Sequence, residues 1–182
     1  MITIFTGPMF SGKSNRLIDE YEKFYNKEDI LVLKPVKDTR TTSKIRARGR
    51  NIDIQAISIK DLSDIYNIIS SDKYKDNRVI FIDEAQFITG DISVILDLSL
   101  HGFDFYIAGL NLTSEQKPFG IMPSILSVSD EIEICKGYCT ECNRPASYTY
   151  FEGGKNKDIV VGDSGYITLC EDCLRKRRKS NE

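Results

Sequence analysis

The stretch "GPMFSGKS", residues 7–14, decides the fold of this chain. A run of β-forming residues, "ITIFT" at 2–6, precedes it, and a segment with apolar residues at helical spacing follows it. The pattern G-x-x-x-x-G-K-[ST] between a strand and a helix predicts a phosphate-binding loop. Glycines let backbone N–H groups turn towards anionic oxygens, and the N-terminus of the helix adds a positive field. We therefore expect an α/β domain that binds a nucleotide.

The residue types within this loop predict how the nucleotide is held. The Lys13 ammonium is expected to reach the outer phosphates, and the Ser14 hydroxyl to coordinate Mg2+. The predicted phosphate-binding residues of the loop are Gly7, Ser11, Gly12, Lys13 and Ser14.

The segment "VIFIDEAQF", residues 79–87, supplies two carboxylates directly after a buried-type strand. Parallel sheets bind ligands at the carboxyl ends of their strands, so Asp83 is expected beside the phosphate loop, in the Mg2+ shell. Glu84 points differently and is the candidate general base, which either deprotonates an incoming hydroxyl or orients a water molecule. On these residues alone, a helix cap or a solvated turn is the alternative.

A second polar segment, "KPVKDTR" at 34–40, follows the next predicted strand. Asp38 and Arg40 are candidates to reach the phosphate cleft, where Arg40 would stabilise the charge of a transferred phosphoryl group. A solvated loop explains these residues almost as well.

Four of the five cysteines form two C-x-x-C pairs, with 27 residues between Cys142 and Cys170. Paired knuckles of this kind predict a tetrahedral Zn2+ site of four thiolates, which is structural because it leaves no open coordination position. The predicted ligands are Cys139, Cys142, Cys170 and Cys173. Cys135 is interpreted as a buried strand residue. Thiols of this kind suit a reducing compartment, so a cytoplasmic location is expected.

Short β-like runs alternate with amphipathic segments up to residue 135, which is typical of a mainly parallel sheet with crossover helices. Asp61 and Asp91 are predicted N-caps of two helices, and Gly102 ends the second. His101, the only histidine, is interpreted as a residue of the last helical turn rather than as a catalyst. Strands are predicted at 2–5, 30–35, 52–57, 78–82, 103–109 and 131–135, and helices from about 14, 61 and 91.

From Lys136 onward the pattern changes to short strands between the cysteine pairs. An aromatic strand at 147–151, a glycine-rich turn at 152–158 and a strand at 159–161 predict a small β module. The expected domains are a P-loop nucleotide-binding α/β domain at 1–135, a zinc ribbon at 136–175 and a basic disordered tail at 176–182.

Composition and size narrow the function. The net charge of -2 and the pI near 5.6 argue against a surface that grips nucleic acid. No apolar run approaches the ~18 residues of a membrane span, and no secretory signal is visible. The residues leave open a kinase, an ATPase acting on nucleic acid, or a binding module with a degenerate nucleotide fold. At 182 residues, the chain is short for a nucleic-acid motor.

The combined motifs resemble the zinc-containing thymidine kinases, the family of the animal cytosolic, bacterial and poxvirus enzymes. "GPMFSGKS", "KDTR", "IDEAQF", "KPFG" and the two C-x-x-C pairs occur in the family's order, from about residue 2 to 173. The resemblance implies a RecA-like P-loop α/β domain with a zinc ribbon. ATP with Mg2+ would phosphorylate the 5′-hydroxyl of thymidine, and Glu84 would be the general base. It also implies a homotetramer and inhibition by thymidine triphosphate.

The resemblance further implies a "lasso" loop, here 153–169, that closes over the thymine largely through backbone groups. An apolar, aromatic-walled pocket with backbone donors suits a methylated pyrimidine. By motif, the thymidine-binding residues are Phe87, Leu110, Phe119, Thr149 and Tyr166.

Several positions depart from the family pattern, and they concern the base rather than the phosphates. They are Ile88, Asn111, Ser114, Val161 and Gly165. Phosphoryl transfer is therefore better supported than the identity of the nucleoside, and deoxyuridine or a broader pyrimidine range is the alternative.

Overall fold

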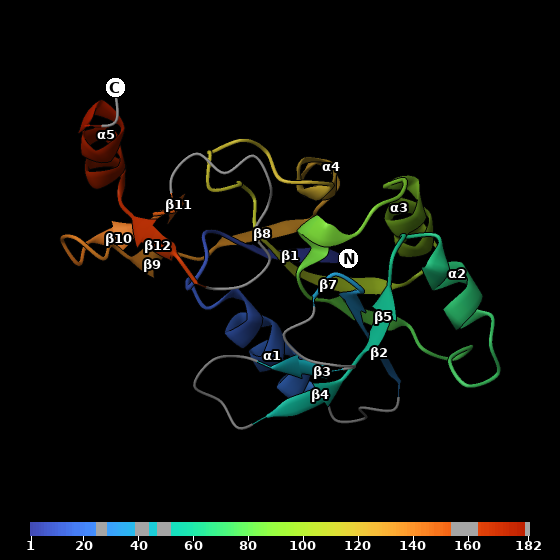
Figure 1. Ribbon diagram of the computed structural model, residues 1–182. Helices are drawn as coiled ribbons and strands as arrows, with labels where there is room; N and C mark the ends of the chain where they lie inside the picture. The colour runs from blue at the N-terminus through green and yellow to red at the C-terminus, as the bar shows by residue number, and fades with distance from the viewer. Residues whose placement is uncertain (25–28, 39–43, 47–51, 154–163, 181–182) are drawn as a thin grey trace.

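A six-stranded sheet forms the centre of the molecule in the computed structural model, which describes residues 1–24, 29–38, 44–46, 52–153 and 164–180. All neighbouring strands are parallel, in the order β5-β2-β6-β7-β1-β8 (Figure 1). The strands are β1 (Ile2–Thr6), β2 (Ile30–Pro35), β5 (Ile57–Ile59), β6 (Val79–Ile82), β7 (Asp104–Gly109) and β8 (Glu131–Ile134).

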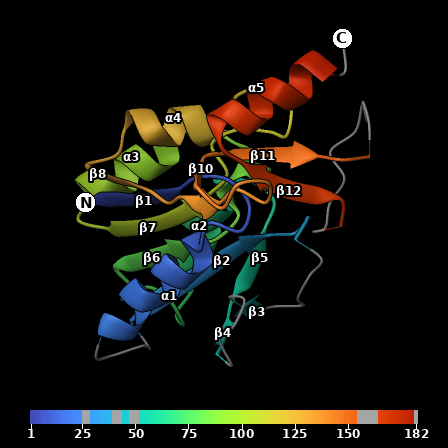
Figure 2. The same ribbon diagram turned by 90° about the vertical axis from the view of Figure 1, so that its left-hand side faces the viewer.

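Helices cover both faces of this sheet. Helix α1 lies against one face, whereas α3 and α4 lie against the other (Figure 2). The strands alternate accordingly: Ile80 and Ile82 pack towards α3, and Phe81 between them packs towards α1. The helices are α1 (Lys13–Lys23), α2 (Asp64–Ile69), α3 (Ser93–Leu100), α4 (Met122–Ser127) and the 3-10 turn η1 (Ala85–Phe87).

This arrangement confirms the predicted α/β class and brings one set of chain segments together. Because the strands are parallel, the residues that follow β1, β6, β7 and β8 all lie at the same edge of the sheet. We call it the carboxyl edge. The phosphate loop, residues 7–14, follows β1, and Asp83 follows β6.

Three predicted boundaries were wrong. The segment 52–57 is not one strand: β4 (Asp53–Gln55) pairs with β3 (Lys44–Arg46), and β5 joins the main sheet. Asp61 does not cap the second helix, whose N-cap is Ser63; its carboxylate accepts the Ser63 N–H instead, at 3.1 Å. Asp91 likewise accepts the Ser93 N–H, one residue before the N-cap of α3. Both aspartates close a turn ahead of the helix.

The C-terminal part consists of two antiparallel strand pairs and a helix. Strand β9 (Gly137–Tyr138) pairs with β10 (Pro145–Ala146), and β11 (Tyr148–Phe151) pairs with β12 (Tyr166–Leu169). We call these four strands with their cysteines the ribbon. The predicted strand at 159–161 lies outside the described residues, and β12 forms where the last residues of the lasso were expected.

The predicted disordered tail is a helix as far as the structure describes it. Helix α5 runs from Glu171 to Ser180, which includes most of the segment 176–182. Acidic residues in its first turn and basic residues in its last complement the helix dipole. Arg177 also pairs with Glu141 and Glu152 of the ribbon. Among the described residues, no helix is long and apolar enough to cross a membrane.

Candidate active site

The phosphate loop turns tightly at the carboxyl edge, and its first glycine is sterically required. A Cβ on Gly7 would lie 2.1 Å from the carbonyl oxygen of Cys135, the residue that follows β8. Gly12 has φ +82 and precedes the first turn of α1. Both positions therefore need glycine, one for space and one for its left-handed backbone.

The predicted magnesium residues contact one another. The Ser14 hydroxyl lies 3.1 Å from each carboxylate oxygen of Asp83, which is only 5% exposed. Two oxygen ligands from different segments thus converge where the loop meets the end of β6, and hard oxygen donors are what Mg2+ prefers. The donor set therefore fits the ion.

The remaining loop side chains turn back onto the loop itself. The buried Lys13 ammonium donates to the Pro8 carbonyl at 2.6 Å and lies 3.5 Å from the Ser11 hydroxyl. Ser11 also donates to the Pro8 carbonyl, at 2.8 Å. The side chains of Ser11 and Lys13 thus both fold back onto the Pro8 carbonyl.

Glu84 points away from its neighbour Asp83, as predicted. It has left-handed backbone angles, φ 54 and ψ 38, and its N–H donates to the Asp83 carboxylate at 3.0 Å. Its own carboxylate accepts a hydrogen bond of 2.6 Å from the side-chain amide of Gln86. The unusual backbone conformation separates the two carboxylates, one towards Ser14 and the other towards Gln86.

Gln86 is the residue of this site that the sequence analysis missed. Its side chain is 3% exposed, and its amide oxygen accepts the Leu110 N–H at 2.9 Å. A buried polar side chain needs such partners. The signal was present in "IDEAQF", where a glutamine stands among residues that become buried, but its partner is 24 residues away along the chain.

Three of the predicted thymidine-binding residues lie around Gln86. The rings of Phe87 and Phe119 meet edge to face with centroids 5.4 Å apart, and Leu110 follows β7. Leu110 and Phe119 are both buried. These residues provide an apolar, aromatic surface next to Glu84.

The other two predicted thymidine-binding residues belong to the ribbon hairpin. The Thr149 hydroxyl accepts the backbone N–H of Met9 at 2.9 Å, so it contacts the phosphate loop directly. The Tyr166 ring packs against Phe151, with centroids 4.9 Å apart. A Cβ on Gly165 would lie 3.0 Å from the same Phe151 ring, and Gly165 has φ +80, so glycine suits this departure from the family pattern.

Asp38 is held by a buried lysine. The Lys34 ammonium, in β2, lies 3.0 Å from the Asp38 carboxylate and donates to the Lys44 carbonyl at 3.3 Å. Lys34 therefore contacts both Asp38, shortly after β2, and Lys44, at the start of β3. Arg40 lies outside the described residues.

The four predicted metal ligands converge. In the described part of the chain, the sulfur atoms of Cys139, Cys142, Cys170 and Cys173 all lie within 4.8 Å of one another. Tetrahedral Zn–S bonds of about 2.3 Å would place the sulfurs about 3.8 Å apart. The Cys142–Cys170 sulfur distance is 3.6 Å, so the donor set fits a four-thiolate zinc site.

The electrostatics of this cluster also favour a cation. Arg144 donates to the sulfurs of Cys142 and Cys170, and its hydrogen bond lowers the pKa of the Cys142 thiol to about 6. Desolvation and the neighbouring thiols raise the pKa of Cys173 instead. Four crowded sulfurs do not all ionise unless a positive charge lies among them.

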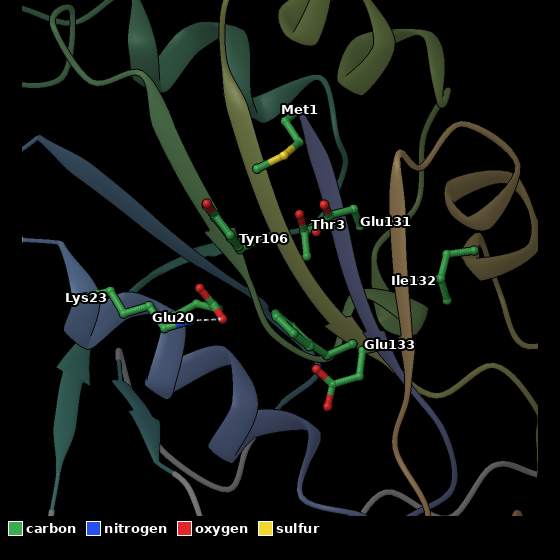
Figure 3. Close-up of a pocket in the computed structure, with 9 residues that line it drawn as sticks. Met1, Thr3, Glu20, Lys23, Tyr106, Glu131, Ile132 and Glu133 are labelled. Atoms are coloured by element: carbon green, nitrogen blue, oxygen red, sulfur yellow. Dashed lines mark hydrogen bonds and ion pairs between the residues drawn. The ribbon is translucent and has the colours of Figure 1, made fainter.

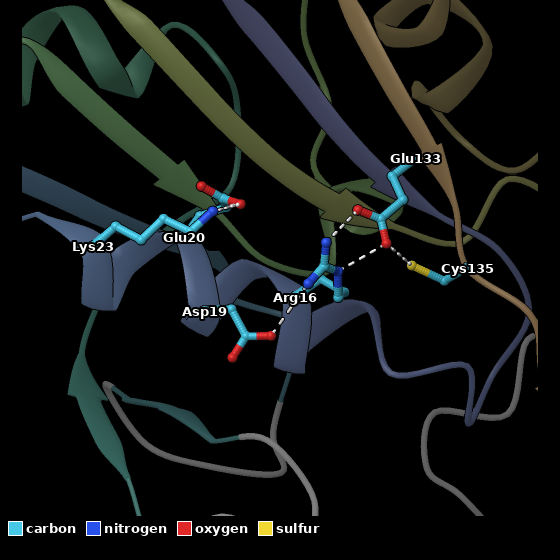
Figure 4. A network of polar contacts seen from close by, with 6 residues as sticks. All are labelled: Arg16, Asp19, Glu20, Lys23, Glu133 and Cys135. Atoms are coloured by element: carbon cyan, nitrogen blue, oxygen red, sulfur yellow. Dashed lines mark hydrogen bonds and ion pairs between the residues drawn. The ribbon is translucent and has the colours of Figure 1, made fainter.

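A pocket elsewhere on the molecule does not belong to this site. It measures about 570 Å³ and lies between α1 and the edge strand β8, and Figure 3 shows Glu20 and Lys23 on α1 and Glu131 and Glu133 on β8. Its remaining lining residues are Met1, Thr3, Phe5, Tyr106 and Ile132. Met1 precedes β1 and Thr3 lies near its amino end, away from the carboxyl edge. Beside it, Arg16 and Glu133 join α1 to β8 through two hydrogen bonds of 2.8 Å (Figure 4).

Comparisons with known proteins identify relatives of this chain. The thymidine kinase of Metamycoplasma arthritidis is 30% identical over 98% of this chain and 92% of that protein. The thymidine kinase of Mycoplasma genitalium is 31% identical over 92% of this chain and 80% of that protein. The thymidine kinase of Pseudothermotoga lettingae is 27% identical over 100% of this chain and 98% of that protein. Among solved structures, the Legionella pneumophila ATPase DotB shows 16% identity and a TM-score of 0.42 over 79% of this chain and 43% of that chain. A family model described as "Thymidine kinase" matches residues 1–174, and the chain therefore belongs to the thymidine kinase family.

Proposed function

We propose that this protein transfers the γ-phosphate of ATP to the 5′-hydroxyl of thymidine. The observation that carries the proposal is the convergence, at one edge of the sheet, of the Ser14–Asp83 pair with Glu84 and its aromatic surroundings. A phosphate-holding pair and a base beside apolar, aromatic residues are the two halves of a transfer site. Family membership makes the nucleic-acid ATPase the less favoured alternative.

The phosphate side of the reaction uses the loop and β6. Ser14 and Asp83 are proposed to hold Mg2+, which neutralises phosphate charge when bound. Gly7, Ser11 and Gly12 shape the loop around the phosphates, and Lys13 exchanges the Pro8 carbonyl for a phosphate oxygen.

The reacting groups are proposed to meet beside the phosphate loop. Glu84 accepts the proton of the 5′-hydroxyl while the oxygen of that hydroxyl forms a bond to the γ-phosphorus, and the bond to the β-phosphate oxygen breaks to release ADP. Arg40 is proposed to stabilise charge on the transferred group, and Asp38 to help place it.

The acceptor side carries the specificity. Phe87, Leu110 and Phe119 supply the apolar surface, and Thr149 and Tyr166 supply the hairpin side of the proposed thymidine pocket. Because the departures from the family fall on this side, deoxyuridine is the second acceptor that we expect to react.

The ribbon is proposed to bind a structural Zn2+ through its four cysteines, and to form a unit, 136–175, separate from the α/β unit at 1–135. The homotetramer and the inhibition by thymidine triphosphate are proposed from the family resemblance. We also propose a cytoplasmic location, since four unoxidised thiols suit a reducing compartment.

The test is a transfer assay with ATP–Mg2+ and a panel of deoxynucleosides, run alongside an ATPase assay with single-stranded DNA. Thymidine should be phosphorylated, and Glu84→Gln should lose about 10²–10⁴-fold in kcat while ATP still binds. DNA-stimulated hydrolysis without nucleoside phosphorylation would overturn the kinase proposal. Full turnover by Glu84→Gln would remove Glu84 from its role.

A further inference from the structure

We propose that Gln86 is a positioning residue that fixes the Glu84 carboxylate relative to the wall of the nucleoside pocket. This inference rests on the proposed function, in which Glu84 is the base. Gln86 donates from its amide nitrogen to Glu84 at 2.6 Å and accepts at its amide oxygen from the Leu110 N–H at 2.9 Å. One side chain thus joins the segment after β6 to the segment after β7.

The orientation of the Gln86 amide is determined by its partners. A backbone N–H only donates, so the amide oxygen must face Leu110, and the NH2 group then faces the carboxylate of Glu84. An ionised carboxylate only accepts, so it matches this NH2 group. A hydrogen bond to a charged group is stronger than a neutral one, so it restrains the orientation of the Glu84 carboxylate.

The surrounding backbone is shaped to admit this glutamine. A Cβ on Gly109 would lie 3.0 Å from the Gln86 amide oxygen and 2.5 Å from the Met122 sulfur. A Cβ on Gly120 would lie 2.2 Å from the Gln86 carbonyl oxygen. Gly109 therefore makes room for the amide of Gln86, and Gly120 makes room for the backbone of the same residue.

The position of this bridge matters for catalysis because its far end is part of the acceptor side. Leu110 begins the segment that leads to Phe119, whose ring meets Phe87 beside Glu84. A nucleoside held by this wall has its 5′-hydroxyl at a distance from Glu84 that the Gln86 bridge maintains. A displacement of about 1 Å between reacting groups costs on the order of 10²-fold in rate.

The test is Gln86→Met, which keeps the length of the side chain and removes the amide. We expect kcat for thymidine to fall about 10- to 100-fold while the Kd for ATP stays within about twofold of the parent protein. Gln55→Met, at an exposed position on β4, is the matched control and should leave kcat unchanged. Zinc content and ATP binding confirm that each variant is folded.

A double-mutant cycle separates positioning from a merely structural role. If Gln86 acts through Glu84, then Gln86→Met causes no further loss of kcat in a Glu84→Gln protein. The inference would be overturned if Gln86→Met lowered kcat by the same factor in the parent protein and in Glu84→Gln. It would also be overturned if Gln86→Met alone left kcat unchanged. Where Gln86→Met does not fold, Gln86→Glu takes its place: it keeps an acceptor for Leu110 and puts a second carboxyl group where the donor to Glu84 was, so the repulsion should displace Glu84 and lower kcat at least as far. The parent protein and Glu84→Gln by themselves decide the proposed function, so the two failures are distinguishable.

Discussion

The sheet and the ribbon are held together by different means. The sheet has two large apolar clusters, one under each layer of helices, with residues such as Phe105 and Ile107 fully buried. Among the described residues, the buried cluster of the ribbon and the start of α5 has six members, and three of them are cysteines: Cys139, Ala146, Leu169, Cys170, Cys173 and Leu174. The sheet can be stabilised by burying apolar surface. The ribbon buries less apolar surface, so its stability depends on its thiols.

The largest expected effect is that of metal removal on the ribbon. Structural zinc contributes on the order of 10 kcal/mol to small domains of this kind, so chelation or Cys173→Ser should unfold the ribbon and leave the sheet folded. Hydrogen exchange should show β11 and β12 losing protection while β6 and β7 keep theirs. Cys135→Ser, at a buried cysteine outside the cluster, is the control and should retain the metal. A protected β12 in zinc-free protein would contradict the comparison.

The next largest effect is expected in the sheet. Phe105→Ala removes a fully buried ring from the central strand β7, and such truncations cost about 3–5 kcal/mol. Urea unfolding followed by circular dichroism should give this loss whether or not zinc is bound. If Phe105→Ala lost stability only in the zinc-free protein, the stability of the sheet would not be independent of the metal.

A smaller effect is expected where the two regions meet. The hydroxyl of Thr168, on β12, donates to the Met9 carbonyl at 3.2 Å and is buried. Thr168→Val should cost about 1 kcal/mol, and it should appear as weaker ATP binding because the phosphate loop loses a support. Thr140→Val is the control, since the Thr140 hydroxyl bonds to the Thr168 carbonyl within the ribbon. Equal ATP affinity in both variants would show that the contact does not shape the loop.

The smallest effect is expected at the exposed Arg16–Glu133 pair between α1 and β8. Arg16→Ala should cost less than about 1 kcal/mol at neutral pH, since exposed ion pairs contribute little. The Arg16 hydrogen bond lowers the pKa of Glu133, so the contribution is present above the unfolded pKa of about 4.3 and is lost as pH falls through the lower folded value. The stability difference between the two proteins should therefore shrink in acid. A constant difference from pH 7 to pH 3 would contradict this.

Features set by local sequence were predictable. The strand at 30–35 was confirmed at its predicted bounds because a continuous apolar run suits a strand buried on both faces. The phosphate loop and the cysteine cluster were predictable because the residue types and their spacing are dictated by the ligand.

Features set by distant partners were not predictable. The side chain of Gln86 accepts a hydrogen bond from Leu110, 24 residues away, and the sequence around either residue does not indicate this contact. Helix α4 has six residues and a proline near its start, and such short helices form through tertiary packing rather than propensity. In the last turns of α5, Arg177 pairs with Glu141 and Glu152, and these partners are distant in sequence.

The two hydrogen bonds between the ribbon and Met9 have a consequence for inhibition. Its backbone N–H bonds to Thr149 and its carbonyl to Thr168, so the middle of the phosphate loop is tied to both strands of one hairpin. A nucleoside analogue bulky enough to push β11 aside would pull on that loop as well. Such a compound should therefore act as a mixed inhibitor with respect to ATP, although it would occupy only the space of the other substrate.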